Sequence, residues 1–213
     1  MTQYARRFLK LIFATSPYRR CGTRVWSLRV RAWLFVASGW FLGGTLPPPC
    51  LAAGSDFTLA SPEISAGVVA TEQVLNAFGC TGRNISPALS WRGAPAATKS
   101  LALTFFDPDA RQGAGFWHWL VINIPATATG LPRGASQRDL PAGSLPTRTD
   151  FGRPGYGGPC PPVGDAPHHY LFTLYALDVV DLTVRADTPP AAVDASLRHH
   201  ALALARITAT YGR

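Results

Sequence analysis

Polar residues that could do chemistry gather in one aromatic stretch of the chain, FFDPDARQGAGFWHWLVINIP (105–125). Asp107 and Asp109 follow a strand-like run, and His118 stands between two tryptophans. Carboxylates beside an imidazole can act as a general acid–base set, as metal ligands, or as the polar wall of a pocket for a small ligand. The residue types alone leave all three chemistries open.

Covalent catalysis and metal binding have little support elsewhere in the sequence. A covalent nucleophile would need a G-x-S-x-G elbow, which the chain lacks, or Cys160, which a disulfide would consume. Asp107, His118 and His168 would make a two-histidine, one-carboxylate metal set, but no H-x-H, H-E-x-x-H or C-x-x-C spacing accompanies them. We therefore expect neither a metal ion nor a cofactor.

A pocket for an anionic group fits these residue types better. Histidine nitrogens and tyrosine hydroxyls can donate to phosphate oxygens. The glycines of GYGGPCPP (155–162) would let backbone N–H groups approach a ligand. Asp107 would then orient His118 or contact a cationic group such as an ammonium, which aromatic walls also favour. The structural alternative is that Asp-Pro begins a turn and the two tryptophans belong to the core.

The elements around these residues should bring them together. Strands are predicted at 56–61, 89–91, 99–106, 116–124 and 169–180 from their β-branched and aromatic residues. The three longest are apolar on successive positions, so both of their faces should be covered. The acids end one strand, His118 begins the next, and PHHY (167–170) enters a third. A Gly- and Pro-rich loop, 130–167, lies between the last two, and strand ends beside a long loop are a natural place for a pocket.

The C-terminal part is predicted to be a helix. Thr188 can cap it, and Pro189 suits the first helical position. Apolar residues then recur at spacings of three and four, at Val193, Leu197, Ala201, Leu204 and Ile207.

The first 53 residues read as an export signal. They hold eight of the 20 Lys and Arg residues and no Asp or Glu, so the formal charge of +8 belongs to this leader. Residues 54–213 carry equal numbers of basic and acidic residues, which argues against a nucleic-acid partner. The apolar stretch 32–46 is short for a bilayer span and ends near a small-residue cleavage site after Ala53. A leader retained as a membrane anchor is the alternative.

Cleavage of the leader would also simplify the cysteines. Cys21 and Cys50 would leave with it, and Cys80 and Cys160 would remain. An even pair in an oxidising compartment predicts a disulfide, with two buried free thiols as the alternative.

Several separate motifs, in order and at matching spacing, resemble the phosphatidylethanolamine-binding protein family and its bacterial Raf kinase inhibitor-like branch. The resemblance extends from about Phe57 to Arg213. The motifs that carry it are GCTGRNISPALSW (79–91), DPDA (107–110), WHWLVINIP (117–125), DFGRPGYGGPCPPVGDAPHHYLFTLYALD (150–178) and TYGR (210–213).

This resemblance implies a mainly β fold of two packed antiparallel sheets with peripheral and C-terminal helices, over residues 54–213. It also implies a small pocket for phosphate-bearing head groups and other anions. Carried over by motif, the ligand-binding residues are Asp107, His118, Tyr156, Gly158, Pro161, Pro162, His168 and Tyr170. Asp109 and Trp117 are the implied supporting residues.

Two positions depart from the family pattern. Arg111 stands where the family usually has proline, which predicts a looser and more basic rim. His169 stands where the family tends to have arginine, which removes a permanent charge near the site.

We therefore expect an exported, non-enzymatic binding protein that meets membranes only through lipid head groups. One alternative is a protein inhibitor of a protease or kinase that uses the pocket as a docking surface. The other is a hydrolase with Asp107 and His118 as acid and base.

Overall fold

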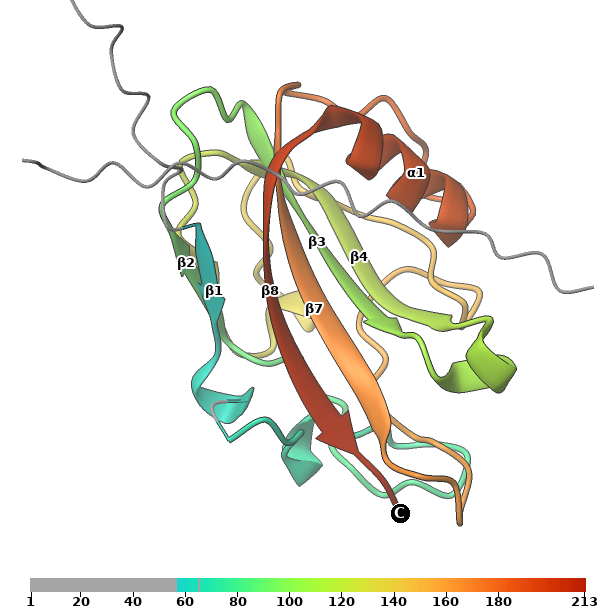
Figure 1. The fold of residues 1–213 in the computed structure, drawn as a ribbon. Helices are drawn as coiled ribbons and strands as arrows, with labels where there is room; N and C mark the ends of the chain where they lie inside the picture. The colour runs from blue at the N-terminus through green and yellow to red at the C-terminus, as the bar shows by residue number, and fades with distance from the viewer. Residues whose placement is uncertain (1–56, 65) are drawn as a thin grey trace, which may run out of the picture. The chain divides into compact units, whose positions relative to one another are not determined.

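The computed structural model describes residues 57–64 and 66–213, so the predicted leader lies outside the described residues. The strands form two antiparallel sheets, in the orders β1–β2–β5 and β6–β4–β3–β7–β8 (Figure 1). The elements are β1 (Thr58–Ala60), η1 (Pro62–Ile64), η2 (Thr71–Gln73), β2 (Leu89–Arg92), β3 (Ser100–Asp107), η3 (Ala110–Gly113), β4 (Phe116–Pro125), β5 (Gly130–Leu131), η4 (Ala135–Gln137), β6 (Leu145–Pro146), β7 (His168–Leu177), α1 (Pro190–His200) and β8 (Ala201–Tyr211).

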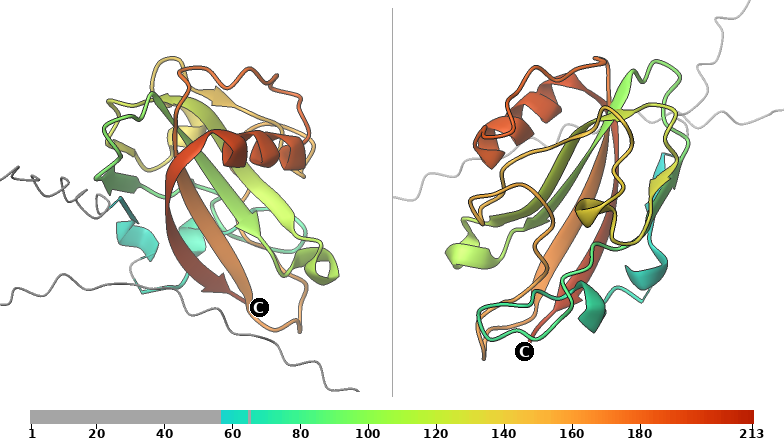
Figure 2. Two further views of the ribbon diagram at one scale, coloured as in Figure 1. Left: turned by 45° about the horizontal axis from the view of Figure 1, so that its top comes forward. Right: turned by 180° about the vertical axis from the view of Figure 1, so that it is seen from behind.

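Two hydrophobic clusters cover the faces of the five-stranded sheet. The larger lies between the sheets, where Leu101, Leu103 and Phe105 of β3 meet Leu89 and Trp91 of β2. The smaller lies on the other face, beneath α1, which crosses one end of the sheet in both views of Figure 2. Because both faces are buried, β3, β4 and β7 are apolar at successive positions, as the sequence predicted.

The predicted C-terminal helix is too long. It begins at Pro190, one residue after the predicted start, and ends at His200. Ala201, Leu204 and Ile207 belong instead to β8, which pairs with β7 along its whole length. In ALALARITATY (201–211) alternate residues such as Ala205 and Ala209 face the core, as in a strand. The hydrogen bonds between β7 and β8 therefore favour a strand over a helix in this segment. The chain therefore ends with a strand and not with a helix.

In the part of the chain that the structure describes, no helix is long and apolar enough to cross a membrane.

Candidate ligand-binding site

A pocket of about 620 Å³ opens where β3, β4 and β7 meet the long loop. Its lining includes eight of the ten predicted site residues: Asp107, Asp109, His118, Gly158, Pro161, Pro162, His168 and Tyr170. Tyr156 and Trp117 do not line it. Residues from three strands and from a loop far along the chain therefore meet in one place.

A β-bulge turns His118 toward this pocket. Phe105 pairs with Trp119 and Phe106 with Trp117, so His118 is the extra residue of β4. Strict alternation would place His118 on the face opposite Trp119, but its ring lies 5.1 Å from Phe105 and 5.5 Å from Tyr170, in the layer between the sheets. Bulges of this kind re-aim a side chain beside a functional site.

His118 is held as a neutral imidazole. Its Nδ1 lies 2.8 Å from the carbonyl oxygen of Gly157 and donates to it, while the Gly157 N–H donates to the His118 carbonyl. Burial lowers the pKa of His118 to about 4, although the Gly157 carbonyl favours the charged form. With its proton on Nδ1, neutral His118 carries a lone pair on Nε2. The Nε2 of His118 is therefore an acceptor, whereas the sequence predicted a donor.

Protonation of His118 should make the protein less stable in acid. Below about pH 6.5 the unfolded chain binds a proton that the folded chain refuses, so the free energy of unfolding should fall until about pH 4, by roughly 3 kcal/mol. Chemical denaturation across this range can be compared with that of His118→Gln, which does not titrate but can still donate to Gly157. Parallel stability–pH curves for the two proteins would contradict this assignment.

Asp107 is buried and orients His168. Its Oδ1 accepts the N–H groups of Asp109 at 2.9 Å and Ala110 at 3.0 Å, which fixes the turn after β3. Its Oδ2 accepts the Nδ1 proton of His168 at 2.8 Å. The sequence predicted that Asp107 would orient His118, but the structure pairs it with the other histidine. The Nε2 of His168 remains for the pocket, with Asp165 Oδ2 3.6 Å away.

Tyr170 contributes a buried hydroxyl that the protein does not fully satisfy. The residue is 0 % exposed and lines the pocket, and among the described residues its hydroxyl oxygen makes no hydrogen bond of ordinary geometry. Burial, the nearby charge of Asp107 and a weak hydrogen bond toward its carboxylate raise the pKa of Tyr170, so the hydroxyl stays protonated. Asp107 already accepts the N–H groups of Asp109 and Ala110 and the proton of His168, which leaves one lone pair on Oδ2 for this weak contact. A buried donor without a partner is costly unless a ligand or water satisfies it.

Tyr156 and Trp117 are structural residues in this arrangement. The Tyr156 hydroxyl donates to the carbonyl of Gln73 at 2.9 Å, and its ring stacks on Phe105 inside the core. Trp117 packs on Phe106 and against the cluster beneath α1, because the bulge separates it from the face of His118. Tyr156 was predicted to contact the ligand, but its hydroxyl turns to Gln73 and the residue does not line the pocket.

The pocket loop, residues 155–162, is fixed by hydrogen bonds from its backbone to the side chain of Asn84. Gly158 N–H donates to Asn84 Oδ1 at 2.7 Å, and Asn84 Nδ2 donates to the Tyr156 carbonyl at 3.3 Å. Because the Gly157 and Gly158 N–H groups are both occupied, these two glycines do not form the backbone anion cradle that the sequence predicted. Gly158 is needed for close approach instead, since a Cβ there would lie 2.0 Å from the Gln73 carbonyl oxygen.

Asn84 was missed by the sequence analysis. Its φ of 52° is one that asparagine tolerates better than most residues, and its amide bonds both the Tyr156 carbonyl and the Gly158 N–H of the pocket loop. A lone Asn before an Ile-Ser-Pro run carries no signal of such a contact.

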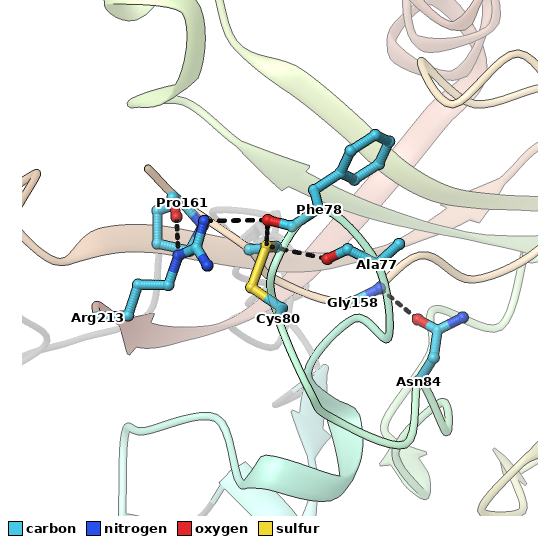
Figure 3. The surroundings of a disulfide bond; sticks show 8 residues. Ala77, Phe78, Cys80, Asn84, Gly158, Pro161 and Arg213 are labelled. Carbon is cyan, nitrogen blue, oxygen red and sulfur yellow. Dashed lines mark hydrogen bonds between the residues drawn. A yellow bond between two sulfur atoms is a disulfide. The ribbon is translucent and has the colours of Figure 1, made fainter. Parts of the chain in front are cut away.

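Asp109 and the disulfide support the rim. Asp109 Oδ2 accepts from the backbone N–H of His169 at 2.6 Å, which lowers the pKa of this carboxyl, and from the His169 ring at 2.9 Å. The predicted disulfide joins Cys80 to Cys160 with Cα atoms 6.0 Å apart, an ordinary separation. Figure 3 shows Arg213 beside it, donating to the carbonyls of Pro161 at 2.6 Å and Phe78 at 3.3 Å.

The pocket is chemically mixed. It contains the carboxylates of Asp107, Asp109, Asp150 and Asp165 and the cationic side chain of Arg111, together with aromatic walls from Phe78, Phe116 and Phe151. None of the described lining residues is a serine, a threonine or a free thiol. In the described part of the chain, no group of three or more His, Cys, Asp or Glu side chains is arranged to hold a metal ion. The arrangement can position a small polar molecule by hydrogen bonds and by charge.

This chain is similar to proteins of one known family. The model of the phosphatidylethanolamine-binding protein family matches residues 65–212. YbcL of Escherichia coli K12 is 46% identical over 164 residues, which are 75% of this chain and 90% of YbcL. LppC of Mycobacterium tuberculosis, named as a candidate lipoprotein, is 39% identical over 145 residues, 68% of this chain and 66% of LppC.

Two solved structures share the fold. The crystal structure of E. coli YbcL, described as a member of the mammalian PEBP family, matches with a TM-score of 0.72 at 45% identity and covers 75% of this chain and 99% of its own. A phosphatidylethanolamine-binding protein homologue of Chlamydia trachomatis matches with a TM-score of 0.62 at 31% identity, over 74% and 97% of the two chains. These matches confirm the resemblance seen in the sequence, and the chain belongs to the phosphatidylethanolamine-binding protein family.

Proposed function

We propose that this protein binds small phosphate-bearing head groups, without turning them over, in the pocket around Tyr170. The observation that carries the proposal is the buried Tyr170 hydroxyl, which lies at the pocket wall without a hydrogen bond of ordinary geometry to the described residues. A phosphate oxygen would satisfy this donor, and burial would strengthen the bond because little water competes with it.

Both histidines can contact the same ligand. His168, oriented by Asp107, offers Nε2 as a second contact. His118 is neutral, so its Nε2 would accept a proton from a monoprotonated phosphate or take up a proton when the ligand binds. The surrounding carboxylates favour a head group that also carries an ammonium, as phosphoethanolamine does. Few charge-assisted bonds oppose the cost of immobilisation, so we expect a Kd on the order of 10 µM to 1 mM.

We further propose that the mature protein works outside the cytoplasm, in the periplasm or secreted. The basic, acid-free leader and the Cys80–Cys160 bond support export, since disulfides persist in oxidising compartments. The candidate-lipoprotein name of the relative LppC points the same way. Contact with a membrane would then be made through lipid head groups.

One observation favours a second role as a protein inhibitor. Phe78 lines the pocket yet is 78 % exposed, and Val163, beside Pro162, is 77 % exposed. Exposed aromatic residues on a fixed loop can anchor a protein partner such as a protease or kinase. Capture of a protein partner that Phe78→Ser abolishes, with head-group binding intact, would identify this role.

Native mass spectrometry of the purified mature protein tests the main proposal. We expect a population carrying a phosphorus-containing small molecule, or taking up added phosphoethanolamine, and we expect its loss in competition with inorganic phosphate. Steady release of phosphate from an added phosphoester would replace the binding proposal with the hydrolase alternative. Absence of any complex at ligand concentrations above the expected Kd would contradict the proposal outright.

A further inference from the structure

Arg111 supplies the permanent positive charge of the pocket. Among the described residues that line the pocket, it is the sole Arg or Lys. Its guanidinium carbon lies 4.6 Å from the centre of the Phe116 ring, and its Nη1 lies 3.6 Å from Asp150 Oδ2. The side chain is 53% exposed, so this ion pair is weak and leaves the guanidinium accessible.

A strained turn presents this arginine. Arg111 and Gln112 have φ/ψ angles of 54°/43° and 58°/37°, in the left-handed region that disfavours residues with a Cβ. Hydrogen bonds hold the turn in place, from the N–H groups of Ala110 to Asp107 Oδ1 and of Gly115 to the Ala110 carbonyl. Proline, the usual family residue, cannot adopt a φ of 54°. The turn therefore differs from one built on proline, and it places a cation at the rim.

The guanidinium can contact a ligand without leaving its place. Asp150 Oδ2 already accepts the Trp117 N–H at 2.8 Å, so this carboxylate is anchored and meets only one edge of Arg111. A guanidinium has five N–H donors, and most remain available. Phe116 contacts both Arg111 and His118, with its ring centre 4.6 Å from the guanidinium carbon of the first and 4.9 Å from the ring centre of the second. Arg111 and Tyr170 line the same pocket of about 620 Å³, so the cation and the polar wall face one ligand space.

We propose that Arg111 makes the pocket selective for head groups that carry a carboxylate in addition to phosphate and ammonium, the chemistry of O-phosphoserine. This inference rests on the proposed binding of phosphate-bearing head groups. The phosphate would lie at Tyr170 and His168, and the carboxylate would take the bidentate donors of Arg111. The ammonium is needed because the carboxylates around the pocket would otherwise repel a ligand with two anionic groups.

The test is isothermal titration calorimetry of O-phosphoserine, phosphoethanolamine and inorganic phosphate against four proteins. These are the wild type, Arg111→Gly, Arg111→Lys and the control Arg138→Gln, which removes an exposed cation outside the pocket. Glycine fits the positive φ, so its variant should fold. We expect the wild type to prefer O-phosphoserine over phosphoethanolamine by roughly tenfold, since a charge-assisted contact at a half-exposed site is worth about that much.

Arg111→Gly should abolish this preference, Arg111→Lys should keep a part of it, and Arg138→Gln should keep all of it. Wild-type binding of phosphoethanolamine without any preference for O-phosphoserine would overturn the role of Arg111 and leave the proposed function standing. Failure of all three ligands would overturn both. The head group can come from free O-phosphoserine or from phosphatidylserine in a membrane. Flotation with phosphatidylcholine vesicles, with and without phosphatidylserine, distinguishes these two sources. Binding of the free ligand or of the lipid supports the inference.

Discussion

Replacing Cys80 and Cys160 together by alanine is expected to lower the free energy of unfolding by about 2–4 kcal/mol. The bond joins residues 80 positions apart, so its removal frees a long loop in the unfolded chain. For a domain of this size the melting temperature should fall by roughly 5–15 °C. Ligand affinity should change little. The bond from the Leu75 N–H to the Pro159 carbonyl and the contacts of Arg213 would still hold the loop around Pro161 against residues 75–80.

The double variant avoids the free thiol that a single replacement would leave. Reduced wild type should melt like the variant, and the variant should not respond to reductant. Identical melting of oxidised and reduced wild type would show that the bond contributes nothing to stability.

Two tyrosines of the same region should respond oppositely to loss of their hydroxyls. Tyr170→Phe removes a buried hydroxyl that makes no hydrogen bond of ordinary geometry, so the variant should be as stable as the wild type or more stable by about 1 kcal/mol. Tyr156→Phe removes the hydrogen bond to the Gln73 carbonyl and should lose about 1 kcal/mol. Thermal denaturation of both variants checks this half of the prediction. A destabilised Tyr170→Phe would mean that its hydroxyl has a structural partner.

The long strands could be predicted because their patterns are local. β3, β4 and β7 are rich in aromatic and β-branched residues and are buried on both faces, which the sequence alone displays. The end of α1 could not be predicted in the same way. Ala201 and Leu204 suit both a helix and an alternating strand, and only the pairing of β8 with β7 decides between them.

The site could be predicted only in part. The sequence predicted that Asp107, His118 and His168 lie together, because each of their motifs stands at the end of a strand. The family resemblance added the residues of the loop. Their hydrogen bonds depend on tertiary geometry. No spacing shows that a bulge turns His118, that Asp107 pairs with His168, or that Tyr156 turns into the core. Nor does it show that the glycine N–H groups are occupied by Asn84 and His118.

The most direct test of the binding proposal is a calorimetric titration of phosphoethanolamine into the wild type, Tyr170→Phe and Tyr156→Phe. The hydroxyl of Tyr170 should contact the ligand, so its loss should weaken binding by roughly tenfold. Tyr156→Phe should bind like the wild type, because its hydroxyl lies outside the pocket. Equal affinity of the wild type and Tyr170→Phe would contradict the binding proposal, since it would show that the Tyr170 hydroxyl does not contact the ligand.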